Sequence, residues 1–224
     1  CPRSEGDRHA GRLGALNAVG SVAGALVTGF VLIPSIGSER TSRLLGALPS
    51  LFALVLARRT FARSAGRRPT ARLVFSLAAL FTFGLAAFLP PWNPLALTSG
   101  TNVYFTRMFV TEGTRLLRFT EDFAGGFTTV VASGKTKTLL TNGKFQGNTG
   151  WEMNAQRFFA HYPSLFVKRH DDALVIGLGT GTTLGTLAAY PWKRLDVVEI
   201  SPSIVEAARL HFQSGNLGAL DDPR

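Results

Sequence analysis

Residues 172–201, DALVIGLGTGTTLGTLAAYPWKRLDVVEIS, decide the fold of this chain. They open with an apolar run, 173–176, which is too short for a helix and suits a buried strand. A helix-compatible segment follows over 182–190, and a second apolar strand is predicted over 195–200. The order strand, turn, helix, strand predicts the first half of a Rossmann-like α/β domain.

Gly177, Gly179 and Gly181 stand at alternate positions where the first predicted strand meets the helix. Glycines there let the backbone turn tightly and approach a ligand, and the helix N-terminus adds unpaired N–H groups. Glu199 ends the second predicted strand, where a carboxylate can accept hydrogen bonds from two ribose hydroxyls. We therefore predict a nucleoside site, and the alternative is a structural turn with a surface glutamate.

The spacing of these glycines indicates the kind of nucleoside. It is GxGxG here, whereas NAD enzymes carry GxGxxG. The shorter spacing favours an adenosyl cofactor of the S-adenosylmethionine type over a dinucleotide.

The length of the chain predicts only part of an α/β domain. Its 224 residues begin with Cys1 and stop at Arg224, soon after a predicted helix. A doubly wound sheet needs more strands than the two predicted here, so we expect a truncated domain whose catalytic residues lie beyond Arg224. The single cysteine excludes an internal disulfide, and the four histidines lack metal-ligand spacing, so no metal is predicted.

The net charge of +10 is unevenly distributed. Residues 1–72 carry eleven arginines and three acids, whereas residues 93–224 are close to balanced. Arginines that flank apolar stretches are better explained by membrane topology than by nucleic acid. We therefore predict no nucleic-acid partner.

Three apolar stretches, at about 13–34, 41–57 and 73–90, are predicted to be transmembrane helices. The first has 22 residues without a charge, which is long enough to cross a bilayer, although a buried helix of a soluble core is the alternative. A loop is predicted over 35–43, and Pro49 is predicted to kink the second stretch. The prediction is a multi-pass protein of the cell membrane, with the lipid bilayer as a partner.

The arginine-rich segment 58–72 raises a question of topology. It has six arginines and no acid, so the positive-inside rule assigns it to the cytoplasm. A third crossing would then carry the soluble domain to the far side, although adenosyl cofactors are made in the cytosol. We expect a cytoplasmic domain, which requires a re-entrant or interfacial third segment, and an external domain stays open.

The rest of the chain is predicted in three parts. Residues 93–113 are a predicted linker, and residues 114–146 a small antiparallel sheet with a turn at Gly125–Gly126. Residues 147–224 belong to the α/β domain, whose first helix is expected to bury Met153, Phe158 and Phe159.

Five motifs, taken in order, resemble the spermidine synthase (polyamine aminopropyltransferase) family, and in particular its membrane-fused branch with N-terminal helices. They are TNGKFQGN, QRFFAHYPSL, ALVIGLGTGTTLG, LDVVEISPSIVEAARLHF and LDDPR, and they cover about residues 114–224. The resemblance implies a small β-sheet followed by a Rossmann-like domain of the S-adenosylmethionine-dependent methyltransferase type. Decarboxylated S-adenosylmethionine would lie over the glycine turn.

The resemblance also implies site residues. Gln146 matches the glutamine that ends the family's DGxxQ segment, and Gln156 falls where the family has a cofactor-contacting glutamine or histidine. The predicted cofactor-binding residues are Gln146, Gln156, Gly177, Leu178, Gly179, Thr180, Gly181, Glu199 and Ile200.

Three positions depart from the family pattern. Thr180 stands where the family has an aspartate that pairs with the cofactor's ammonium, and a hydroxyl cannot supply that charge. Ala155 replaces a tyrosine, and Trp151 replaces an acidic residue. The losses at Ala155 and Trp151 weaken the case for a polyamine substrate.

Three functions follow as hypotheses. The first is a membrane-attached enzyme that transfers an aminopropyl group from decarboxylated S-adenosylmethionine to a small-molecule amine. The second keeps the fold and transfers a methyl group from S-adenosylmethionine. The third is a non-catalytic sensor of nucleoside or polyamine on a transporter-like bundle. Fold alone does not decide among the three. A homo-oligomer is compatible with each.

Overall fold

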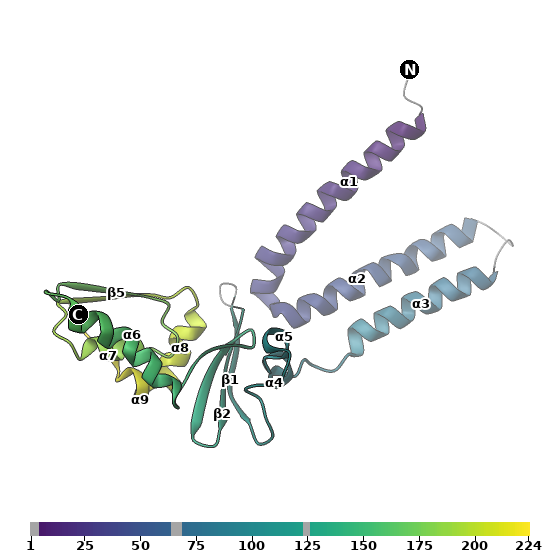
Figure 1. Ribbon diagram of the computed structural model, residues 1–224. Helices are drawn as coiled ribbons and strands as arrows, with labels where there is room; N and C mark the ends of the chain where they lie inside the picture. The colour runs from purple at the N-terminus through teal and green to yellow at the C-terminus, as the bar shows by residue number, and fades with distance from the viewer. Residues whose placement is uncertain (1–4, 64–68, 123–125) are drawn as a thin grey trace. The chain divides into compact units, whose positions relative to one another are not determined.

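The computed structural model describes residues 5–63, 69–122 and 126–224. The chain divides into two compact units, Cys1–Trp92 and Asn93–Arg224. The first is helical, and the second combines helices with two sheets (Figure 1). Parts of the arginine-rich segment 58–72 and of the predicted turn at Gly125–Gly126 lie outside the described residues.

The first unit begins with one long helical run. Helix α1 (Glu5–Val27) continues through a π-helical turn, η1 (Thr28–Leu32), into α2 (Ile33–Arg63). The loop predicted over 35–43 is wrong, because only Gly37 among these residues departs from helical geometry (φ 81°, ψ 163°). An ion pair four residues apart supports the helix here, since Arg43 pairs with Glu39 at 2.6 Å, and Ser42 donates to the Ser38 carbonyl on the preceding turn.

Helix α3 (Pro69–Phe88) lies beside α2 in Figure 1. A hydrogen bond of 2.8 Å joins the hydroxyls of Ser50 and Thr82 across the two helices, and Gly46 faces Ala86 closely. The break in α2 falls at Gly37 rather than at Pro49, where the sequence predicted a kink. By length and composition, the described helices contain one candidate membrane span, His9–Leu56, and a shorter apolar helix over Leu73–Phe88.

The second unit begins with two short helices, α4 (Pro94–Leu97) and α5 (Thr101–Tyr104), within the predicted linker. Asn93 explains the first of them, because its side-chain oxygen accepts hydrogen bonds from the amides of Leu95 and Ala96.

An antiparallel sheet follows in the order β1 (Arg115–Asp122), β2 (Gly126–Ser133), β3 (Thr136–Thr141) and β4 (Lys144–Asn148). The sequence did not predict β4, which is polar and glycine-containing. The β3–β4 register shifts between Leu139 and Leu140.

The predicted β-turn-α-β unit is confirmed. Strands β5 (Asp172–Ile176) and β6 (Arg194–Val198) pair in parallel, with helix α7 (Thr182–Ala188) between them in the sequence. Helix α8 (Pro202–His211) follows, and then the short turns α9 (Gln213–Asn216) and η2 (Ala219–Asp221).

Helix α6 (Glu152–Phe166) corrects the predicted buried face. Phe158 and Phe159 are 65% and 72% exposed, whereas Ala160 and Ser164 are buried. The fully buried residues of α6 are therefore small, whereas Met153 is half-buried, as is Gln156, which contacts Thr183 of α7.

The antiparallel sheet and the α/β segment share one apolar core. Val130 and Leu139, from β2 and β3, pack in the same buried cluster as Leu184 and Phe212. Lys137 on β3 also donates to the His211 carbonyl at the end of α8. The sheet therefore supports the edge of the α/β segment where the glycine turn lies.

Candidate functional site

The glycine turn joins β5 to α7. Gly177, Gly179 and Gly181 all have positive φ, between 55° and 86°, a conformation that other residues adopt at a cost. At Gly181 an added Cβ would also lie 2.9 Å from the Cβ of Asn216. The Asn216 amide donates to the Thr180 and Ala208 carbonyls, so a buried polar side chain supports the turn from below.

Glu199 lies one residue beyond the end of β6. Its Oε2 accepts a hydrogen bond of 2.9 Å from the Leu178 amide, and its Oε1 accepts one of 3.0 Å from the Ser201 amide. The carboxylate therefore connects the glycine turn to the start of α8. A carboxylate has about four lone-pair sites, so two remain for hydroxyl donors.

Three side chains and one carbonyl form a hydrogen-bond chain behind the turn, and a fourth side chain joins it from α7. The Thr180 hydroxyl donates its one proton to Oε1 of Gln156 at 2.7 Å. The 2.9 Å contact between the Thr180 and Thr182 hydroxyls must therefore have Thr182 as the donor. Nε2 of Gln156 then donates to the Gln146 carbonyl at 3.2 Å, and Thr183 donates to the Gln156 carbonyl. We call this series the 182–180–156–146 chain.

The start of α8 is fixed from both sheets. The Ser201 hydroxyl accepts from the Ile204 amide as the helix N-cap and donates to Oδ2 of Asp122 at 2.6 Å. Asp122, the last residue of β1, also accepts from the Ser203 amide. A carboxylate at this position complements the positive end of the helix dipole.

These elements enclose a cleft of about 540 Å³. It is lined by Thr141, Gln146, Gln156, Ile176, Gly177, Leu178, Gly179, Thr183, Glu199, Ile200, Ser201 and Ile204. Seven of the nine predicted cofactor-binding residues are among them. The exceptions are Thr180 and Gly181, which are buried and do not line the cleft.

Five lining residues were not predicted: Thr141, Ile176, Thr183, Ser201 and Ile204. Ile176 and Ser201 directly neighbour predicted site residues, so a wider window around the glycines and Glu199 would have included them. Thr141 comes from β3, and no local pattern links it to the glycine turn.

The cleft is almost neutral. Glu199 is the one carboxylate among its described lining residues, and no lysine, arginine or histidine lines it. Within the described ranges, no group of three or more His, Cys, Asp or Glu side chains is arranged to hold a metal ion.

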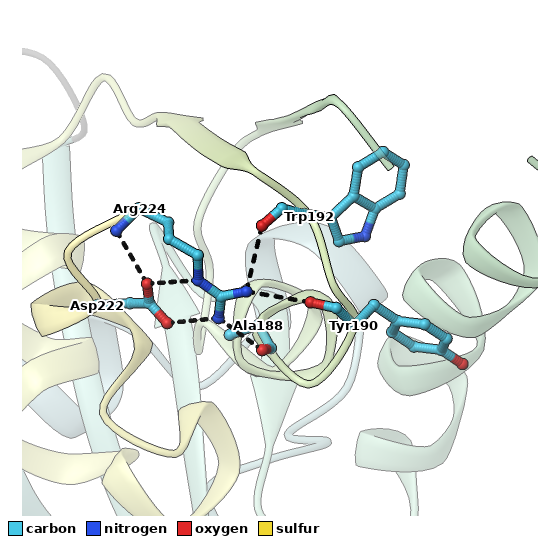
Figure 2. Close-up of polar contacts among 5 residues, drawn as sticks. All are labelled: Ala188, Tyr190, Trp192, Asp222 and Arg224. Carbon is cyan, nitrogen blue, oxygen red and sulfur yellow. Dashed lines mark hydrogen bonds and ion pairs between the residues drawn. The ribbon is translucent and has the colours of Figure 1, made fainter. Parts of the chain in front are cut away.

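Arg224 stabilises the opposite end of α7 (Figure 2). Its guanidinium donates to the carbonyls of Ala188, Tyr190 and Trp192 at 2.7, 3.1 and 3.2 Å. Asp222 accepts from the same guanidinium, and this bonding lowers the pKa of Asp222 to about 2. The LDDPR motif therefore holds the carbonyl of the last residue of α7 and two carbonyls of the loop that follows, and it does not line the cleft.

The sequence is similar to proteins named polyamine aminopropyltransferase. Polyamine aminopropyltransferase 2 of Aquifex aeolicus is 25% identical over 192 residues, which are 85% of this chain and 35% of that protein. The polyamine aminopropyltransferase of Corynebacterium efficiens is 27% identical over 95% of this chain, and polyamine aminopropyltransferase 1 of Streptomyces coelicolor is 24% identical over 94%. The chain spans 35–39% of the length of these relatives.

Two solved structures overlap with part of the chain. One is a spermidine synthase in complex with the transition-state analogue AdoDATO, and the other is the spermidine synthase of Thermotoga maritima. Each has a TM-score of 0.44 and 21% identity, and covers 49% of this chain and 38% of its own.

No family model matches the chain. The similarity therefore rests on the curated relatives. They share the name polyamine aminopropyltransferase, and three of them match more than four fifths of this chain.

Proposed function

We propose that the cleft binds the adenosyl part of a sulfonium cosubstrate and that the protein is an alkyltransferase of the polyamine aminopropyltransferase type. The observation that carries the proposal is the position of the Glu199 carboxylate, held by the Leu178 and Ser201 amides at the wall of the cleft. Its two remaining lone-pair sites suit the two hydroxyls of a ribose.

The apolar part of the cleft suits an adenine ring next to the ribose. Ile176 directly precedes the glycine turn and Ile200 directly follows Glu199. Both side chains line the cleft, and they are 83% and 75% exposed. Exposed isoleucines lose unfavourable contact with water when a flat apolar ring covers them. Gly177 presents open backbone beside them, since a Cβ added there would meet nothing within 4 Å.

The reaction would be a displacement at a carbon bonded to positive sulfur. The lone pair of an amine forms the new N–C bond while the C–S bond breaks, and sulfur takes the electron pair to become a neutral thioether. The amine then loses its proton to a base. A protein accelerates this step chiefly by holding the amine in line with the C–S bond and by accepting the proton.

The donor of the first candidate is decarboxylated S-adenosylmethionine, and the transferred group is aminopropyl, in agreement with the names of the relatives. The second candidate is methyl transfer from S-adenosylmethionine. It is favoured by Thr180, because this buried neutral residue adds no negative charge near the glycine turn.

The helical unit supports membrane attachment. The contact between α2 and α3 uses small and polar residues, including Gly46, Ser50, Thr82 and Ala86. Large apolar side chains point outward instead: Leu48, Leu51, Phe52, Leu77, Leu80, Phe81 and Phe88 are exposed. This arrangement is typical of helices that pack against each other in lipid.

The sequence matches are not confined to the second unit. Residues 93–224 make up less than two thirds of the chain, whereas the match to the Aquifex protein covers 85% of it. That match must therefore extend into the helical unit.

We also propose that residues 93–224 face the cytoplasm, where the donor is made. The apolar part of α3, Leu73–Phe88, would span about 24 Å at 1.5 Å per residue, less than the roughly 30 Å of a bilayer core. The apolar part of α3 is therefore shorter than a full crossing of the membrane requires. Protease protection of the C-terminal unit in sealed inside-out vesicles would contradict this location.

Calorimetry of the full-length protein in detergent tests the nucleoside site. The ligand is 5′-methylthioadenosine, the neutral thioether left by aminopropyl transfer. We expect Glu199→Gln to weaken its binding on the order of tenfold, because one acceptor of the ribose hydroxyls is lost. Glu206→Gln is the matched control, since Glu206 pairs with Arg118 outside the cleft. Equal binding by both variants would refute the site.

A further inference from the structure

Three of the described lining residues carry a hydroxyl group: Thr141, Thr183 and Ser201. Two of these hydroxyls give their proton to the protein itself, because Thr183 donates to the Gln156 carbonyl and Ser201 donates to the Asp122 carboxylate. The Thr141 hydroxyl differs, since its buried oxygen has no hydrogen-bond partner among the residues that the structure describes. A buried polar group without a partner is costly, so this threonine needs a physical explanation.

Thr141 lies on the side of the cleft where Glu199 is held. Leu139 and Thr141 are alternate residues of β3, so their side chains share one face of the sheet. Leu139 packs in one buried cluster with Leu178, which lines the cleft. The Leu178 amide in turn donates to the Glu199 carboxylate. The Thr141 side chain therefore belongs to the part of the cleft where the ribose is proposed to bind.

A ribose at this position needs hydrogen-bond donors as well as acceptors. A ribose hydroxyl that donates to a carboxylate still has an oxygen that can accept, and an ionised carboxylate cannot donate to it. The amides of Leu178 and Ser201 donate to Glu199 itself, and the amide of Gly177 donates to the Val198 carbonyl. A hydroxyl with no partner in the protein supplies the kind of group that the ribose still lacks.

A single bond rotation changes the direction of this hydroxyl. Its oxygen is buried, although Thr141 lines the cleft and is half-buried as a whole. Side chains in strands have more than one common χ1 value, and a change between them moves the hydroxyl to another staggered position on Cβ. A ligand that offers a hydrogen-bond partner removes the cost of the unpaired group, and this favours rotation toward the cleft.

We propose that Thr141 is a ligand-binding residue of the cleft, whose hydroxyl turns toward the bound nucleoside and donates to the oxygen of a ribose hydroxyl. The inference rests on the proposed adenosyl site and adds a side chain to it. The ribose would then be held by an acceptor from the end of β6, Glu199, and by a donor from β3. The site would therefore distinguish a ribonucleoside from a deoxyribonucleoside through two side chains.

Thr141→Val tests the proposal in the full-length protein in detergent, because valine has nearly the same shape and lacks the hydroxyl. In the free protein we expect the thermal unfolding midpoint to rise by roughly 2–4 °C, since a buried unpaired polar group is removed. In calorimetry with 5′-methylthioadenosine we expect binding to weaken about fivefold, since a hydrogen bond to the ligand is lost. A purely structural threonine would not give opposite effects on stability and binding.

Thr128→Val is the matched control. Thr128 lies directly opposite Thr141 in the β2–β3 register, its side chain is fully buried, and its hydroxyl also has no partner within the described part of the chain. Thr128 is not among the described lining residues of the cleft. We expect Thr128→Val to raise the midpoint similarly and to leave binding unchanged. Thr141→Ser keeps the hydroxyl and should bind within about twofold of the wild type.

Deoxy ligands identify the atom that Thr141 contacts. We expect the effect of Thr141→Val on binding to disappear with either the 2′-deoxy or the 3′-deoxy form of 5′-methylthioadenosine, because one of these ligands lacks the accepting oxygen. An undiminished effect with both forms would overturn the assignment to the ribose.

The remaining outcomes separate this inference from the proposed function. A lower midpoint for Thr141→Val would mean that the hydroxyl is bonded within the protein, and equal binding by this variant and the wild type would mean that it does not touch the ligand. Either result overturns the inference and leaves the adenosyl site in place. If the wild type does not bind 5′-methylthioadenosine, the adenosyl site fails and the inference fails with it.

Discussion

At the scale of single residues, two glycines of the same turn should differ in what they tolerate. Gly177 and Gly181 have similar φ values, 86° and 78°, so an alanine at either would be strained by about 1 kcal/mol or more. At Gly181 the added Cβ would also meet Asn216, whereas at Gly177 it meets nothing within 4 Å. Steric contact with Asn216 therefore adds to the cost of an alanine at Gly181, whereas backbone strain is the whole local cost at Gly177.

We predict that Gly181→Ala lowers the thermal unfolding midpoint of the full-length protein more than Gly177→Ala does. Both variants are measured in the same detergent, and Gly177→Ala serves as the control for backbone strain. Equal midpoints would mean that Asn216 moves aside, and that the close packing beneath the turn has no energetic weight.

Asp222 should make stability depend on pH in the acidic range. Its pKa falls from the usual 3.8 to about 2 in the fold, because of its hydrogen bonds with Arg224. The folded state therefore binds this proton less readily than the unfolded state. The stabilisation is present above about pH 4 and is lost as the pH falls toward 2.

The measurement compares the wild type with Asp222→Asn, which cannot ionise, in unfolding experiments from pH 6 to pH 2. We predict that the wild type is the more stable of the two at pH 6 and that the difference shrinks below pH 4. A difference that stays constant across this range would assign the Asp222 contribution to shape rather than charge.

At the scale of secondary-structure elements, the sequence predicted best the elements whose structure depends on residues that are close together in the sequence. The glycine turn and its two strands are local, and they were located to within about two residues. The helix across residues 35–40 was missed because its serines, glycine and charged residues have the composition of a loop, whereas the structure continues the helix there, with an ion pair between Glu39 and Arg43.

The face of α6 was mispredicted for a different reason. Its aromatic residues match a helical period, but Phe158 and Phe159 are exposed, and Ala160 and Ser164 are the buried residues of the helix. In the cleft, Thr141 arrives from β3, and the burial of Thr180 depends on Gln156 in another helix. Such contacts between distant residues cannot be predicted from spacing.

The α2–α3 pair offers a prediction about helix packing. The Ser50 and Thr82 hydroxyls share a hydrogen bond of 2.8 Å between the helices. Interhelical hydrogen bonds in membrane proteins contribute about 0.6 kcal/mol on average. We predict a coupling of about this size in a double-mutant cycle of Ser50→Ala and Thr82→Ala, measured by unfolding in detergent or bicelles. Full additivity of the two substitutions would show that the bond contributes nothing.

At the scale of the whole molecule, residues 93–224 are expected to unfold as one unit. The antiparallel sheet and the α/β segment look separate in the sequence, where a turn and a change of pattern divide them. In the structure they share a core, because Leu139 of β3 is fully buried in the cluster that contains Leu184 and Phe212. The cleft lies along this shared boundary, so its geometry depends on both parts.

Leu139→Ala tests that dependence. Removing a buried leucine side chain should cost about 2–5 kcal/mol, through lost burial and the cavity that remains. We predict that amide hydrogen exchange then accelerates in α7 and α8 as well as in β2 and β3, because one core stabilises them all. Phe159→Ala is the control, since Phe159 is exposed and its loss should leave exchange nearly unchanged. Faster exchange confined to the antiparallel sheet would mean that the two parts open independently and that the cleft is formed by docking rather than by a common core.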